Sequence, residues 1–160
     1  MLESIRWRKD QPIFFAKIAE ENFPELHKEL PRKFDKIEEY YKCCTDVVDN
    51  FPDKIQQMAK DAAQKHWELT DQANFATGPD WIAYQIIRIY NILFYVHTVK
   101  KMRKEALSDE KFEKDCMDAN YVTMLSKAHI LLTKDTKLQI PLAEAAYPDK
   151  AVLTDANNLL

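Results

Sequence analysis

A long run of apolar residues between positions 81 and 103 constrains the fold of this chain more than any other feature. The residues are apolar on most sides of a helix, and such a helix is normally buried inside a protein. The run is long enough to cross a membrane, but four polar residues interrupt it: Gln85, Arg88, Asn91 and His97. Polar and charged residues are costly in lipid. We therefore predict that residues 81–103 form the central buried helix of a globular protein. We expect no membrane partner.

Three earlier segments carry apolar residues at intervals of three and four, which is the spacing of one helical face. They span about residues 12–23, 32–50 and 53–70. The loop that follows, residues 71–79, contains the only glycine of the chain, Gly78. Because glycine supplies tight turns and phosphate-binding loops, its scarcity favours helices and excludes a glycine-rich nucleotide site.

The period of the apolar residues changes in the last quarter of the chain. Asp118 can open a helix, and residues 129–133 then form a short apolar run that predicts a buried strand of a parallel sheet. A second short helix is predicted at 138–146, followed by a turn and a second strand at 151–154. Helix, strand, helix and strand in this order are typical of α/β structure.

The fold class follows from these patterns. We predict a mainly α fold with a small α/β C-terminal portion, in which a helical bundle packs on a short parallel sheet. A chain of 160 residues, 46% of them hydrophobic, suits one domain with a sizeable core. We expect a single domain over residues 1–160, with a helical part at 12–116 and an α/β part at 117–155.

Charge and cysteine content limit the classes of function. A net charge of −3 argues against a strongly basic nucleic-acid-binding protein, although metal ions can offset the carboxylates of an RNA-cutting site. Cys43, Cys44 and Cys116 are an odd number with an adjacent pair, which is unlike a disulfide framework. The charged start of the chain does not resemble a signal peptide. We therefore expect a reducing, cytoplasmic setting.

Two acidic residues are predicted to share one edge of the sheet. Asp135 follows the strand predicted at 129–133, and ligands bind at the carboxyl ends of strands in open α/β sheets. Asp118 can lie on the same edge, and together they could hold Mg²⁺ or Mn²⁺, which would activate a water or clamp a phosphate. Asp115 could add a third carboxylate or be solvated. The alternative is that Asp118 caps a helix and Asp135 is a turn residue.

The sequence DANYVTMLSKAHILLTKD, residues 118–135, resembles the C-terminal half of PIN-like nuclease domains. The resemblance extends over residues 118–154. It implies that Asp118 and Asp135 are ligands of a Mg²⁺ or Mn²⁺ site that cuts RNA, with Thr133 as the hydroxyl of the Thr-x-Asp turn. The family begins with a strand that ends in another metal-binding Asp, and this chain has no such strand before residue 118. The resemblance therefore implies the C-terminal portion of such a domain, or a degenerate member.

A polar stripe on the central helix adds one candidate. The stripe consists of residues spaced by three or four: Gln85, Arg88, Asn91, Tyr95 and Thr98. It fits either the solvent-facing edge of a packed helix or a face turned toward a cleft, where Arg88 could bind a phosphate.

Three hypotheses of function follow. The first is a metal-dependent ribonuclease, with Asp118 and Asp135 as catalytic metal ligands, Asp115 as a further ligand, and Arg88 and Thr133 as substrate-binding residues. The second is a non-catalytic helical protein-interaction module, with dispersed carboxylates and an exposed apolar helical face. The third is a small-ligand pocket lined by aromatic residues and Arg88. If the sheet has only two strands, a second chain or a second copy could complete it.

Overall fold

A computed structural model describes residues 34, 36–66, 78–102 and 108–155. The helix predicted at 12–23 lies outside these residues. The described part consists of helices and two short strands: α3 (Ile37–Asp49), α4 (Pro52–His66), α5 (Ile82–Met102), α6 (Asp109–Thr123), η2 (Met124–Ser126), β1 (Ile130–Leu132), α7 (Gln139–Ala146) and β2 (Ala151–Leu153). The predicted fold class, mainly helical with a small parallel sheet, is confirmed.

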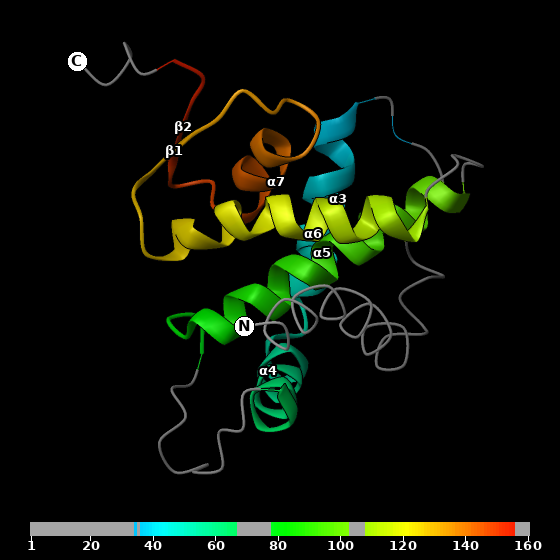
Figure 1. Cartoon of the computed structure of the whole chain (residues 1–160), viewed down its shortest axis with the longest axis vertical. Helices are drawn as coiled ribbons and strands as arrows, with labels where there is room; N and C mark the ends of the chain where they lie inside the picture. The colour runs from blue at the N-terminus through cyan, green and yellow to red at the C-terminus, as the bar shows by residue number, and fades with distance from the viewer. Residues whose placement is uncertain (1–33, 35, 67–77, 103–107, 156–160) are drawn as a thin grey trace.

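Helix α5 is the centre of the core. It packs against α3, α4 and α6, and in Figure 1 it runs between α6 and α4. Fully buried apolar side chains project from it on several sides, among them Ile87, Ile92 and Val96. Their burial by surrounding helices explains why this run is so apolar. Among the described residues, no helix combines the length and apolarity that crossing a membrane would require.

The polar stripe on α5 faces the interior. Gln85, Asn91 and Tyr95 are all buried, so the interpretation of the stripe as a solvent-facing edge is wrong. The Gln85 amide donates to the Pro79 carbonyl at 2.7 Å and accepts from the Tyr147 hydroxyl at 2.7 Å. Because buried polar groups are stable when they are hydrogen-bonded, Gln85 can connect α5 to the residues before it and to the end of α7, whereas Asn91 and Thr98 bond carbonyls of their own helix.

The two strands lie at one side of the molecule, beyond the ends of α6 and α7 (Figure 1). They pair in parallel, with Ile130 opposite Ala151 and Leu132 opposite Leu153. The prediction that the first strand is buried is only half right. Leu131 packs against the core, but Ile130 is 45% exposed and Leu132 is 50% exposed, because the helices cover one face of the sheet.

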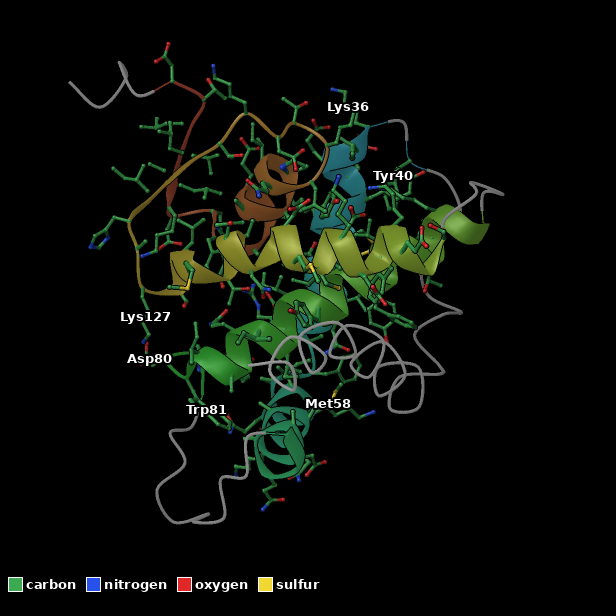
Figure 2. The ribbon with its side chains drawn as sticks, in the orientation of Figure 1. Lys36, Tyr40, Met58, Asp80, Trp81 and Lys127 are labelled. Carbon is green, nitrogen blue, oxygen red and sulfur yellow. The ribbon has the colours of Figure 1, made fainter. Side chains whose placement is uncertain are left out.

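The α/β portion is attached to the helices at several points. Helix α7 packs between α3 and α6, with Leu142 and Ala143 fully buried. The Lys127 ammonium, just after η2, donates to the Asp80 carbonyl at 2.6 Å, and Figure 2 shows these two residues facing each other. The α/β portion is therefore held on a packed support.

Candidate functional site

The turn between β1 and α7 carries Thr133 and Asp135 at the carboxyl end of β1. The Thr133 N–H donates to the Leu153 carbonyl at 2.9 Å, which continues the pairing of the strands by one residue. The Asp135 N–H then donates to the Thr133 hydroxyl oxygen at 3.1 Å. The strand pairing and this local bond together fix where Asp135 leaves the sheet.

The Asp135 carboxylate organises the start of α7. One oxygen, Oδ1, accepts from the backbone N–H groups of Lys137 at 2.9 Å and Leu138 at 3.1 Å. The Asp135 carbonyl accepts from the N–H of Ile140 at 3.0 Å. The two carboxylate bonds hold the turn that leads into α7, and the carbonyl bond satisfies one N–H of its first turn, so Asp135 is a turn residue, as the alternative interpretation expected. Among the described residues, no hydrogen bond engages the second oxygen, Oδ2, which leaves it available to a ligand.

Gln139 connects this turn to the helix that carries Asp118. The Thr133 hydroxyl donates to Gln139 Oε1 at 2.6 Å, and Gln139 Nε2 donates to the Asp118 carbonyl at 3.1 Å. The structure thus links the turn of Thr133 and Asp135 to the main chain at Asp118, through the Asp118 carbonyl and not through its carboxylate. No sequence pattern singled out Gln139, because its partners lie 6 and 21 residues away on different elements.

Asp118 does not open a helix, contrary to the prediction. Helix α6 begins at Asp109, where the Ser108 side chain accepts from the Lys111 N–H at 3.2 Å. Buried Cys116 and Ala119 continue the apolar face across position 118, so the helix runs on. Asp118 therefore lies half-buried in the second half of α6, and its role as an N-cap is excluded.

Asp115 is buried rather than solvated. Its Oδ2 lies 2.9 Å from His97 Nε2, and its Oδ1 accepts from the Lys111 ammonium at 2.7 Å. Burial raises the pKa of Asp115, but the bonds to His97 and Lys111 outweigh it and hold the pKa below its usual value. In the described part of the chain, no three His, Cys, Asp or Glu side chains gather into a metal-binding group. Asp115, Asp118 and Asp135 therefore do not form one by themselves.

The pairing of Asp115 predicts an acid-sensitive contribution to stability. A carboxyl whose pKa is lowered by folding stabilises the protein above its unfolded-state pKa, and this contribution is lost as the pH falls through the folded-state pKa. We expect the wild type to be more stable than Asp115→Asn at pH 7, with the difference shrinking below about pH 4. Urea unfolding of both proteins between pH 3 and 7 measures it. Asp149→Asn, which removes an exposed carboxylate, is the control variant. A difference between the wild type and Asp115→Asn that stays constant with pH would contradict the assignment.

Arg88 lies away from the turn that carries Asp135. Its guanidinium binds both carboxylate oxygens of Asp49, at 2.6 and 2.7 Å, and donates to the Ala146 carbonyl at 3.1 Å. Ala146 ends α7, whereas Gln139 begins it, so Arg88 sits at the opposite end of that helix. The structure does not bring Arg88 to Asp118 and Asp135; it places Arg88 where it ties α5 to α3 and α7.

Tyr41 of α3 supports the turn from the core side. Its hydroxyl lies 3.4 Å from the Lys137 carbonyl, to which it donates. Burial, and then the nearby carboxylates of Asp115 and Asp135, raise the pKa of Tyr41 far above its usual value. The phenol is therefore a neutral donor at any physiological pH. In the sequence, Tyr41 is one residue of the segment predicted as a helix at 32–50, and nothing local marks its contact with this turn.

Comparison with protein-family models, with curated proteins and with solved structures found no match. The chemistry of the site must therefore be judged from its own groups. Asp135 places one carboxylate at the carboxyl end of a parallel strand, and carboxylate oxygens are ligands that a hard cation prefers.

Proposed function

We propose that this chain is a PIN-like, metal-dependent ribonuclease or the C-terminal portion of one, in which Asp118 and Asp135 bind Mg²⁺ or Mn²⁺. The observation that carries the proposal is the bridge through Gln139, which joins the turn of Asp135 to the helix of Asp118. Asp135 Oδ2 takes part in no capping bond, and hard cations prefer oxygen ligands. Among the described residues, no hydrogen bond engages the Asp118 carboxylate or Asp135 Oδ2, so in this proposal both can bind the cation.

Each residue of the edge has a separate role in this proposal. Asp118 and Asp135 hold the cation, and Thr133 fixes the turn from which Asp135 projects. A bound Mg²⁺ or Mn²⁺ supplies a Lewis acid and lowers the pKa of a coordinated water. The exposed Lys134 and Lys137 flank Asp135 and provide positive charge for the phosphate backbone of RNA.

Two carboxylates leave most of the coordination sphere of a cation unfilled, so the proposal requires a further acidic residue. The outer edge of β1 offers a place for it. β1 pairs with β2 through the His129 carbonyl and the Thr133 N–H, so the backbone groups of Ile130 and Leu132 point to the other edge. A parallel strand from a second chain or a second copy, added there, would bring its carboxyl end next to Asp135.

One observation favours the alternative, a non-catalytic protein-interaction module. Three large side chains at helical spacing are exposed along α6 and η2: Met117, Tyr121 and Met124. Tyr121 is 64% exposed. An exposed apolar stripe of this kind commonly marks a contact with another protein. We also infer a cytoplasmic setting for either function, because all three cysteines are free thiols.

An RNA cleavage assay tests the enzymatic proposal. We expect Mn²⁺-dependent cleavage of single-stranded RNA by the wild type, and a loss of at least about 100-fold in Asp118→Asn, because a metal ligand is removed. Asp118 shows no side-chain hydrogen bond within the described residues, and its carbonyl still accepts from Gln139 in the variant, so the fold should persist.

The control is Asp149→Asn, which removes one exposed carboxylate from the turn between α7 and β2. It should cleave like the wild type. Equal cleavage by Asp118→Asn and the wild type would contradict the assignment of the site. Metal binding without cleavage by the wild type would identify the chain as a portion that needs a further carboxylate.

A further inference from the structure

The outer edge of β1 is open among the described residues. The sheet has two strands, and β1 pairs with β2 through inward-facing groups that include the His129 carbonyl and the Thr133 N–H. The backbone groups of Ile130 and Leu132 therefore point away from β2. The side chains of the same two residues are 45% and 50% exposed. Because two short strands form a marginal sheet, a strand added at this edge would stabilise it.

The open edge is basic, although the protein as a whole is acidic. Residues 127–137 contain three lysines and one aspartate, a formal charge of +2, whereas the whole chain carries −3. Lys134 and Lys137 are exposed, and within the described residues their ammonium groups form no hydrogen bond or ion pair. The exposed Asp149 and Asp155 flank β2, on the other side of β1. The edge thus presents an apolar centre between basic ends.

A second copy of the chain fits this edge poorly. Two copies of β1 paired in antiparallel would bring Lys134 of each copy near Lys127 of the other, so that like charges meet. The β2 strand of a second copy has acidic residues near its ends, but Ala151 and Leu153 turn their backbone groups toward β1. Val152 alone then points its backbone groups outward. The edge therefore favours a longer segment from another protein.

We infer that the open edge of β1 binds an extended acidic segment of another protein, which has apolar residues at alternate positions and carboxylates at both ends. Such a segment adds a strand through main-chain hydrogen bonds to Ile130 and Leu132. Its apolar side chains lie beside theirs on the open face of the sheet, and its carboxylates pair with lysines such as Lys134 and Lys137. The inference concerns the edge named in the proposed function, but it does not rest on metal binding.

Fluorescence anisotropy with a labelled synthetic peptide, Glu-Asp-Val-Thr-Val-Thr-Val-Asp-Glu, tests the inference. The titration contains EDTA, so metal ions play no part in it. We expect saturable binding that weakens as the salt concentration is raised, because exposed charges are screened. A peptide with lysines in place of its acidic residues should bind at least about tenfold more weakly, because its charges repel those of the edge.

Charge reversal of the two exposed lysines measures the contribution of the basic ends. Lys134→Glu combined with Lys137→Glu should weaken binding of the acidic peptide at least about fourfold, since each reversal replaces an attraction with a repulsion. The matched control combines Lys54→Glu with Lys114→Glu, which reverses exposed lysines on α4 and in the first half of α6. The control changes the net charge equally and should bind the peptide within about twofold of the wild type.

Two N-methylated peptides test the added strand without any change to the protein, so misfolding of a variant cannot affect the result. Successive N–H groups of a strand point to opposite edges. Methylation of the valines therefore blocks one edge of the peptide, and methylation of the threonines blocks the other. One of these peptides should lose at least about tenfold in affinity, and the other should bind within about threefold of the unmodified peptide. Equal affinities of the two would overturn the addition of a strand.

Other results would also overturn the inference. Equal binding of the acidic and lysine peptides, or equal binding by the Lys134–Lys137 double variant and its control, would exclude recognition by charge. Dimerisation of the wild type in analytical ultracentrifugation that excludes the peptide would assign the edge to a second copy. Binding of oligouridylate RNA without binding of the acidic peptide would assign the lysines to RNA.

The test is separate from that of the proposed function. A wild type that binds the peptide but no Mn²⁺ would overturn the metal site and support the open edge as a docking surface. A wild type that binds Mn²⁺ but not the peptide would overturn the docking surface and leave the metal site in place.

Discussion

Leu142→Ala should lower the free energy of unfolding by about 2–5 kcal/mol, the range for truncating a fully buried leucine. Leu142 lies on α7 with no exposed surface, where that helix packs between α3 and α6. Its removal leaves a cavity under the element that carries Gln139. Because α7 has only 8 residues, it cannot persist as a helix without this packing.

Urea unfolding measures the effect, and Leu132→Ala is the matched control. Leu132 is also a leucine, but it lies on β1 and is 50% exposed. Its replacement should therefore change the free energy of unfolding by less than about 1 kcal/mol. Equal losses in the two variants would contradict the packing of the α/β portion on the helices. A large loss in Leu132→Ala alone would show that the open face of β1 is covered in solution.

The helices of the core could be predicted because their apolar residues recur at the helical period. Helices α3, α4 and α5 lie within a few residues of the ranges expected, and the C-terminal order of helix, strand, helix and strand is confirmed. In each case a buried stripe or a short apolar run bounded by polar turns carried the signal. The sequence predicted a short parallel sheet without fixing the number of its strands, and the described residues form two.

The errors came from residues whose environment depends on distant partners. The polar stripe of α5 resembles a solvent-facing edge in sequence, but Gln85 is satisfied by Pro79 and by Tyr147, which lies 62 residues away. Asp115 resembles a solvated acid, yet it is buried against His97 and Lys111. Spacing along one helix cannot reveal a partner on another element.

The candidate site could be predicted only in part for the same reason. Asp135 follows a predicted strand, so its position at the carboxyl end of that strand could be predicted from the sequence. Asp118 was expected at the start of a helix, because an acidic residue before an apolar face is a common capping pattern. The Ser108 cap begins the helix earlier instead. Gln139, which joins the two, carries no local signal.

Asp135→Asn should have the largest effect on metal binding. The substitution keeps Oδ1, which can still accept from the N–H groups of Lys137 and Leu138, so the start of α7 should be preserved. It removes the negative charge and the carboxylate oxygen that a hard cation prefers. We expect the Mn²⁺ affinity to fall by more than the roughly 10- to 100-fold that loss of an outer-shell partner costs.

Titration calorimetry with Mn²⁺ on the wild type, Asp135→Asn and Asp149→Asn tests the central claim most directly. The account predicts saturable binding at one site in the wild type and in Asp149→Asn, and its loss in Asp135→Asn. No binding by the wild type, or equal binding by Asp135→Asn, would contradict a metal site at the carboxyl end of β1.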